Sequence, residues 1–314
     1  MKLVSIIIPA YNEEKNIRPV YEKLKEVIAP LNGKYVFEIL FVNDGSRDDT
    51  QAEIEKLALE DREVGYVSFS RNFGKELATT AGINNCKGDA CIMIDSDLQH
   101  PAELIPEFIR KWEDGNDVVV GVRRGSKSDS WIKKSGSKLF YKILNRIAEV
   151  EVVPNATDFR LINRAMINEF NQFTEVNRMT RALIDWLGFK RAYVYFDANE
   201  RLNGTASYSF WKLVKLAMNS FVSLSLLPLK LAGYFGIFIT LLSGILGAYI
   251  LLEKYFLHLH TFASTFSDAE NLAIFIVFLV GIILMSIGLI AMYVANIHRE
   301  VIQRPIYVIR KKNK

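Results

Sequence analysis

Two carboxylates and one amide lie close together in the segment Asp95-Ser96-Asp97-Leu98-Gln99. This segment follows the apolar run 90–94, which has the composition of a buried parallel strand. Carboxylate and amide oxygens are ligands that Mg²⁺ and Mn²⁺ prefer. In open α/β sheets, ligands bind just beyond the carboxyl ends of the strands. The pattern therefore predicts a divalent-metal site formed by Asp95, Asp97 and Gln99. The structural alternative is that the two aspartates cap a helix beginning at Pro101, which leaves Gln99 without a role.

Three other predicted strands also end in polar residues. Apolar, β-branched runs at 4–9, 35–42 and 64–69 alternate with segments of helical apolar spacing, and a fifth run follows at 117–121. This alternation predicts an α/β fold with a doubly wound, mostly parallel sheet. The right-handed crossover rule places the strand ends, with their polar clusters, at one edge of the sheet. These clusters indicate a ligand with hydrogen-bonding groups and negative charge, and they are Tyr11-Asn12-Glu13, Asp44, Arg71-Asn72 with Lys75, and 95–99.

The pattern is less regular after Gly121. A polar loop rich in glycine and serine is expected at 123–130, and helical spacing follows at 131–148. No strand is predicted at 156–161, and more helix is expected from there to Trp186. A last strand is expected at 191–196, followed by a polar loop at 199–204.

The C-terminal part of the chain is far less charged than the rest. Residues 209–228 predict an amphipathic helix, either at a membrane interface or packed on the preceding domain. The segments 231–252 and 272–295 contain no charged residue, and each is long enough to span a bilayer. Basic residues concentrate after the second segment, so the positive-inside rule places both termini in the cytoplasm.

Composition excludes several classes of protein. The 314 residues are 50% hydrophobic, with a mean hydropathy of +0.12, and the net charge of only +4 does not indicate a nucleic-acid partner. Two cysteines cannot on their own form a disulfide framework or a four-ligand zinc site. The chain has no Gly-x-x-x-x-Gly-Lys-Ser/Thr motif, which argues against a P-loop NTPase. The first apolar run is too short for a signal peptide, so the N-terminal domain is expected in the cytoplasm.

Several motifs in order along the chain resemble those of family 2 glycosyltransferases with the GT-A fold. They are Pro9-Ala10-Tyr11-Asn12-Glu13-Glu14, Asp44-Gly45-Ser46 and Asp95-Ser96-Asp97-Leu98-Gln99-His100-Pro101. With 71–75, 157–161 and the two apolar C-terminal segments, the whole chain resembles polyprenyl-phosphate glycosyltransferases of the dolichol-phosphate-mannose synthase and bactoprenol glucosyltransferase kind. The resemblance implies a GT-A catalytic domain at 1–208, an interfacial helix at 209–228, two transmembrane helices at about 231–252 and 272–295 within 229–298, and a basic cytoplasmic tail at 299–314.

The resemblance also implies roles for individual residues. Asp44 accepts a hydrogen bond from the base, although a solvated strand-end turn is the structural alternative, and Asp95, Asp97 and Gln99 hold Mg²⁺ or Mn²⁺ between the two donor phosphates. Asp97 and Asp158 are the expected catalytic residues. The expected contacts to the nucleotide sugar come from Pro9, Ala10, Tyr11, Glu13, Asp44, Lys75, Asp95 and Ser96.

The role of Asp158 depends on the acceptor. A lipid monophosphate carries about 1.5–2 negative charges at neutral pH by analogy with phosphoserine, so its oxygen is nucleophilic without a base. Asp158 therefore acts as a general base, orients the acceptor, or holds Arg160. Arg123 and Arg201 are the expected ligands of the acceptor phosphate, because a guanidinium matches phosphate oxygens.

The expected activity is inverting, metal-dependent transfer of one hexose from a nucleotide sugar to polyprenyl (undecaprenyl) phosphate at the cytoplasmic membrane face. Glucose or N-acetylglucosamine carried by UDP is favoured by analogy, and the product would serve cell-envelope glycosylation. The expected partners are the donor, the lipid phosphate and the bilayer, and assembly of several copies is left open. The alternatives are a synthase using GDP-mannose, a processive polysaccharide synthase, and a membrane-anchored scaffold without catalysis. A processive enzyme is disfavoured because the chain lacks a Gln-x-x-Arg-Trp motif.

Overall fold

The computed structural model describes residues 1–124, 153–175, 178–197, 268–302 and 304–313, together with Tyr234 and Phe238. The chain divides into two compact units. One comprises Met1–Ser207 together with Gln303–Lys314, and the other comprises Tyr208–Ile302. The first unit is therefore built from both ends of the chain.

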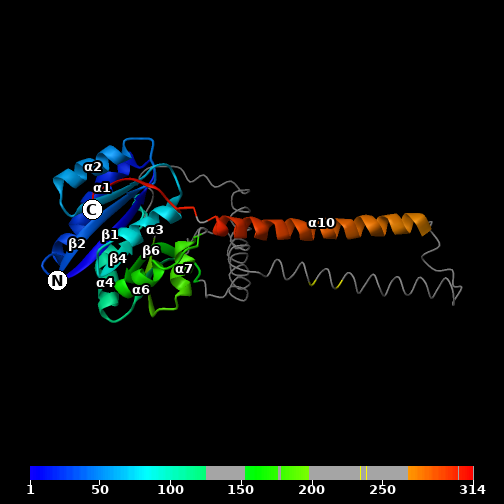
Figure 1. The fold of residues 1–314 in the computed structure, drawn as a ribbon. Helices are drawn as coiled ribbons and strands as arrows, with labels where there is room; N and C mark the ends of the chain where they lie inside the picture. Colours follow the sequence, from blue (N-terminus) through cyan, green and yellow to red (C-terminus); the bar gives the residue numbers. More distant parts are fainter. Residues whose placement is uncertain are drawn as a thin grey trace. The chain divides into compact units, whose positions relative to one another are not determined.

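An eight-stranded sheet forms the centre of the first unit (Figure 1). Its strand order is β7-β5-β6-β4-β1-β2-β3-β8, and of these described strands only β6 and β8 run antiparallel to their neighbours. The predicted α/β fold with a mostly parallel sheet is thus confirmed. The strands are β1 (Lys2–Ala10), β2 (Tyr35–Asn43), β3 (Val64–Phe69), β4 (Ala90–Met93), β5 (Val118–Arg123), β6 (Ala156–Asn163), β7 (Arg191–Phe196) and β8 (Ile309–Lys312).

Helices cover both faces of this sheet, as a doubly wound fold requires. Successive side chains of a strand point to opposite faces, so Ile6 and Ile8 join one apolar cluster and Ile7 joins the other. The first cluster includes α1 (Glu14–Ile28), α2 (Thr50–Glu60) and α4 (Ile105–Glu113). The second includes α3 (Lys75–Asn85), α6 (Arg164–Phe170) and α7 (Thr180–Trp186). Short 3-10 turns, η1 (Ala29–Leu31) and η2 (Ala102–Leu104), follow α1 and precede α4.

Strand β6 occupies the segment 156–161, to which the sequence pattern assigned no element and after which it predicted helix. It lies between β4 and β5 and is antiparallel to both, and helix begins only at Arg164. Phe159 and Leu161 pack into the first apolar cluster, whereas Arg160 between them is buried by pairing with a distant carboxylate. Because Arg160 is charged, its buried position is not recognised in the sequence, and the segment does not show the pattern of hydrophobic residues typical of a buried strand.

Strand β8 is the second element that the sequence pattern missed. Residues 309–312 lie in the segment predicted as a basic tail, yet they pair antiparallel with β3 at the edge of the sheet. Their side chains are exposed, so no apolar pattern marks the strand. The pairing instead depends on backbone hydrogen bonds and on side-chain contacts with β3, α2 and α3.

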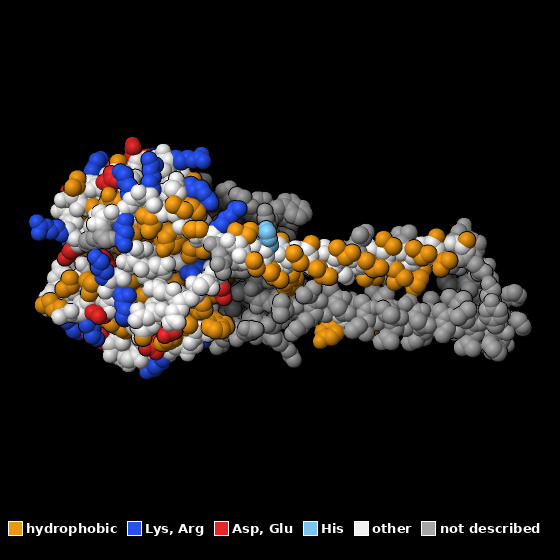
Figure 2. Space-filling model, in the orientation of Figure 1, with side chains coloured by type: hydrophobic (Ala, Val, Ile, Leu, Met, Phe, Trp, Pro, Cys, Tyr) orange, Lys and Arg blue, Asp and Glu red, His pale blue; other side chains and the backbone are white. Residues whose placement is uncertain are grey.

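The described part of the second unit is essentially one helix, α10 (Asp268–Val301). Figure 2 shows hydrophobic side chains exposed along its length. Ile276, Ile283 and Met285 are among the exposed side chains. By the combined criteria of length, hydropathy and charge, no helix in the described part of the chain qualifies as a membrane span. The predicted interfacial helix at 209–228 lies outside the described residues, as does 231–252 apart from Tyr234 and Phe238. The two transmembrane helices and the domain boundaries stay predictions.

Candidate functional site

The carboxyl ends of the parallel strands meet at one edge of the sheet. Ala10 at the end of β1 is level with Asn43 at the end of β2, which is level with Ser68 of β3. On the other side of β1, Met93 at the end of β4 pairs with Ile7. The polar segments 11–13, 44–46, 70–75 and 95–99 therefore follow neighbouring strands, as predicted. This edge is the candidate functional site.

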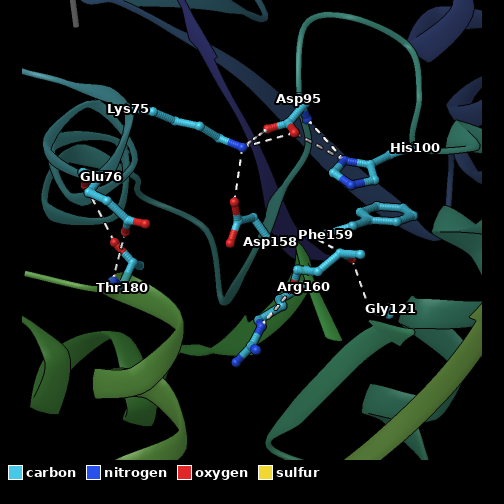
Figure 3. Close-up of polar contacts among 10 residues, drawn as sticks. Lys75, Glu76, Asp95, His100, Gly121, Asp158, Phe159, Arg160 and Thr180 are labelled. Atoms are coloured by element: carbon cyan, nitrogen blue, oxygen red, sulfur yellow. Dashed lines mark hydrogen bonds and ion pairs between the residues drawn. The ribbon is translucent and has the colours of Figure 1, made fainter. Parts of the chain in front are cut away.

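Lys75 lies at the centre of the site and joins two carboxylates that are distant in sequence (Figure 3). It is the first residue of α3, and its Nζ lies 2.7 Å from an oxygen of Asp95 and 2.9 Å from Oδ2 of Asp158. Asp95 follows β4, whereas Asp158 is on β6. Burial alone would lower the pKa of Lys75, but the two carboxylates raise it well above its usual value. The ammonium group is therefore charged at neutral pH.

Asp158 is a carboxylate under the same conditions. Burial favours its neutral form, but the charge and hydrogen bond of Lys75, together with the charges of Arg181 and Arg160, outweigh burial and lower the pKa of Asp158. The alternative that Asp158 holds Arg160 is wrong. Arg160 points away from Asp158 in Figure 3, and its Nη1 instead donates to Asp185 at 2.9 Å. Its Nε donates to the carbonyl oxygen of Thr157 at 3.0 Å. This bond joins two residues of β6 that lie on either side of Asp158 in the sequence.

The turn after β4 is held by contacts within itself. Oδ1 of Asp97 accepts from the backbone N–H of Gln99 at 3.1 Å, and Leu98 has a positive φ of 57°. Nδ1 of His100 lies 3.4 Å from the backbone N–H of Asp95 and accepts from it. Burial lowers the pKa of His100, which keeps the ring neutral and able to accept. Neither η2 nor α4 has a side-chain cap, so helix capping does not explain the two aspartates.

The side chains of Asp95, Asp97 and Gln99 offer two carboxylates and an amide oxygen in one turn at a strand end. This donor set fits a hard divalent cation such as Mg²⁺ or Mn²⁺. Within the described ranges, no group of three or more acidic, histidine or cysteine side chains is arranged to hold a metal ion. The metal site therefore stays a prediction that rests on the chemistry of the donors.

Asp44 has a structural partner set that the sequence did not indicate. Its side chain is buried, and its oxygens accept from the backbone N–H groups of Phe73 at 2.7 Å and Gly74 at 2.9 Å. A third bond of 2.8 Å comes from the amide of Asn72. Burial raises the pKa of Asp44, and the backbone donors counteract part of this effect. Asp44 thus fixes the segment 70–74, and its predicted contact with a base stays a prediction.

The turns 44–46 and 70–74 also touch through their backbones. Gly45 has a φ of +65°, and a Cβ atom there would lie 2.2 Å from the carbonyl carbon of Arg71. Only glycine fits both the conformation and the space. The turns after β2 and β3 therefore form one rigid pair.

The other predicted residues are distributed around this edge. Pro9, Ala10 and Ser96 are buried, and Tyr11 is 40% exposed. The Glu13 carboxylate accepts from the side-chain amide of Asn16 at the start of α1. Arg123 is exposed at the end of β5, and Arg201 lies outside the described residues.

Residues of α7 line part of the site, and the sequence pattern did not predict this. A small hollow beside Asp158 is lined by Lys75, Arg160, Thr180 and Arg181, among others. The backbone N–H of Thr180 donates to Glu76 of α3 at 2.8 Å, which fixes α7 beside Lys75. Only the position of β6 reveals that Arg181 lies near Asp158, and its charge contributes to the lowered pKa of Asp158.

Comparisons with known proteins identify the family of this chain. The model of glycosyl transferase family 2 matches residues 5–170, which include most of β1, all of β2 to β6, and α6. The putative glycosyltransferase CsbB of Bacillus subtilis is 40% identical over 311 residues, which are 99% of this chain and 92% of that protein. The SfII prophage-derived bactoprenol glucosyl transferase of Shigella flexneri is 35% identical over 313 residues, covering 99% and 98%.

An uncharacterized glycosyltransferase of Synechocystis is 39% identical over 306 residues, covering 98% of this chain and 94% of that protein. Among solved structures, glucosyl-3-phosphoglycerate synthase of Mycobacterium tuberculosis with Mn²⁺, UDP-glucose and phosphoglyceric acid has a TM-score of 0.45 at 19% identity. That match covers 71% of this chain and 78% of the synthase chain. The family model and the relatives aligned over nearly the whole length lead to one conclusion: the chain belongs to glycosyl transferase family 2 and is a glycosyltransferase.

Proposed function

We propose that this glycosyltransferase moves one hexose from a nucleotide sugar to polyprenyl phosphate, with inversion at the anomeric carbon. Relatives named bactoprenol glucosyl transferase, 34–35% identical over 98–99% of this chain, support a lipid-linked acceptor and favour glucose. UDP as the nucleotide is favoured by analogy with bacterial enzymes of this kind. The observation that carries the proposal is the convergence of Asp95 and Asp158 on Lys75 at the ligand-binding edge of the sheet.

The reaction is a single displacement. A phosphate oxygen of the acceptor forms a bond to the anomeric carbon, the bond from that carbon to the nucleoside diphosphate breaks, and the products are hexosyl polyprenyl phosphate and the free nucleoside diphosphate. Two anionic substrates must approach each other, so the site needs fixed positive charge. The ammonium of Lys75 is neutralised by Asp95 and Asp158, so this charge must come from a divalent cation and from arginines. Arg123 at the end of β5 is a ligand for the acceptor phosphate in this proposal, as is Arg201.

A divalent metal held by Asp95, Asp97 and Gln99 would neutralise the departing diphosphate. Asp158 is ionised because Lys75 and the neighbouring arginines lower its pKa, yet the acceptor arrives already charged and needs little help from a base. Its role in this proposal is to hold Lys75 and orient the acceptor. The buried pair of Arg160 with Asp185 keeps β6, and therefore Asp158, in position.

We also propose that the chain is anchored in the cytoplasmic membrane, with the catalytic domain and both termini on the cytoplasmic side. The uncharged segments 231–252 and 272–295 support two transmembrane helices, and the exposed apolar side chains of α10 are consistent with a lipid environment. A polyprenyl chain stays in the bilayer, so an anchored enzyme meets its acceptor at the membrane surface. After alkaline carbonate extraction the chain is expected in the membrane pellet, and release into the supernatant contradicts the anchor.

The activity is tested with the full chain in lipid nanodiscs containing undecaprenyl phosphate. Separate reactions receive UDP-glucose, UDP-N-acetylglucosamine or GDP-mannose with Mg²⁺ or Mn²⁺, and lipid-extractable labelled sugar is counted. UDP-glucose is expected to give the most product, with one sugar per lipid and inverted anomeric configuration. Asp158→Asn is expected to abolish most turnover, whereas Asp114→Asn at the exposed end of α4 is the matched control. Absence of product with all three donors contradicts the proposed function, and several sugars per lipid indicate a polysaccharide synthase.

A further inference from the structure

The C-terminal segment 304–313 contacts β3, the strand that is followed by the turn 70–74 of the candidate site. It belongs to the same compact unit as residues 1–207, and its strand β8 covers the free edge of β3. The pairing extends beyond the strand at both ends. The side chain of Asn313 accepts from the backbone N–H of Tyr66 at 2.7 Å, and the carbonyl of Val308 accepts from the backbone N–H of Ser70 at 2.9 Å. The segment therefore reaches the first residue of the turn 70–74.

Tyr307 is the side chain of this segment that contacts the end of β3. Its ring stacks on Phe69 with 5.0 Å between centroids and an interplanar angle of 15°. Its hydroxyl accepts from the side-chain amide of Asn84 on α3 at 3.1 Å. Tyr307 thus joins the last residue of β3 to the helix that begins with Lys75.

The contacts continue from Phe69 into the turn that Asp44 fixes. The ring of Phe73 meets Phe69 edge-on at 5.6 Å, and the guanidinium of Arg71 lies 3.9 Å from the centre of the Phe73 ring. The backbone N–H of Phe73 donates to Asp44. One continuous chain of aromatic and hydrogen-bonding contacts therefore runs from Tyr307 to Asp44.

We propose that Tyr307 is a positioning residue for the donor nucleotide, acting through Phe69 and Phe73 on the turn 70–74. In this proposal, the C-terminal segment after α10 supports the part of the site that binds the nucleotide. The inference rests on the proposed function in one respect, that a nucleoside diphosphate binds at this edge of the sheet. It adds to that function a part of the chain far from the other site residues in sequence.

The test measures UDP binding to the full chain in nanodiscs by calorimetry, with Mn²⁺ present. Tyr307→Ala removes the stacked ring and is expected to weaken UDP binding about two- to tenfold, the range of one aromatic pair. Tyr307→Phe keeps the ring and should bind UDP as the wild type does. Lys311→Ala breaks an ion pair of the same strand with Glu55, away from Phe69, and is the matched control. The KM for the donor should rise in Tyr307→Ala while kcat at saturating donor stays within about twofold.

Hydrogen exchange of the nucleotide-free chain gives a second measurement. Tyr307→Ala should speed exchange of the backbone amides of Phe73 and Gly74, and Lys311→Ala should leave them unchanged. Wild-type UDP affinity and unchanged exchange in folded Tyr307→Ala overturn the inference, as does a fall in kcat with an unchanged KM. If the wild-type chain binds neither UDP nor GDP, the proposed function fails and the inference with it. Normal nucleotide binding by every variant overturns the inference alone.

Discussion

Replacing Asp185 with alanine is expected to destabilise the catalytic unit severely. The guanidinium of its partner Arg160 is 1% exposed, and Asp185 is the carboxylate paired with it at 2.9 Å. The two remaining bonds of Arg160 go to backbone carbonyl oxygens and do not balance its charge. Removing one partner of a buried ion pair costs about 3–5 kcal/mol. A domain of this size loses about 2–4 °C in Tm for each kcal/mol, so we expect Tm to fall by roughly 6–20 °C.

The assay is thermal unfolding of the full chain in detergent, followed by intrinsic fluorescence. Asp197→Ala is the matched control, because it removes the carboxylate of an exposed arginine pair, with Arg124, in the same unit. Exposed pairs contribute about 0–1 kcal/mol, so its Tm should stay within a few degrees of the wild type. The double variant Arg160→Met/Asp185→Leu should recover part of the loss, since the buried charge of Arg160 is removed together with its partner. Recovery is incomplete because Arg191, whose Nη1 lies 3.5 Å from Asp185, also loses this carboxylate. A Tm for Asp185→Ala equal to that of the control would refute the reasoning.

Three further perturbations test the site. Lys75→Met should raise the pKa of Asp158, because the ammonium that lowers it is lost while burial remains; ¹³C NMR of the carboxylate measures the shift. In the wild type, the pairing of Asp158 with Lys75 stabilises the folded state at pH values above about 4, the pKa of an aspartate in the unfolded chain. This stabilisation is lost as the pH falls through the lower pKa of Asp158 in the folded state. The Tm of Lys75→Met should therefore depend less on pH in this acid range. Gly45→Ala should destabilise the unit by about 1–3 kcal/mol in urea unfolding, since a positive φ and a backbone clash coincide there. Chelation with EDTA should abolish sugar transfer, and added Mn²⁺ should restore it; full activity without metal contradicts the metal site.

The sequence predicted those elements whose pattern is local. β1 to β5 and β7 are apolar runs bounded by turn residues, and α1 and α3 are segments of helical apolar spacing between these runs. The polar clusters at the strand ends could be placed together because the crossover rule fixes their edge. The ligand site could therefore be predicted from two kinds of information. One is the residue types within each short cluster, and the other is the direction of the strand that each cluster follows.

The missed elements depend on contacts between distant residues. The strand β6 contains Arg160, which is compatible with burial only because Asp185 follows 25 positions later on α7. The strand β8 consists of exposed basic and aliphatic residues, and it forms because β3 offers an unpaired edge. The bridge from Asp95 through Lys75 to Asp158 depends on β6 and was not visible for the same reason.

The position of β8 has a consequence for the synthesis of this protein. The strand follows α10 in the chain, so the edge of β3 has no partner until synthesis has passed α10 and reached residues 309–312. An open strand edge readily pairs with other chains during folding. A recombinant fragment that ends near residue 207 keeps this edge open permanently and should aggregate. Joining residues 304–313 to such a fragment through a flexible linker would supply the missing strand and close the sheet.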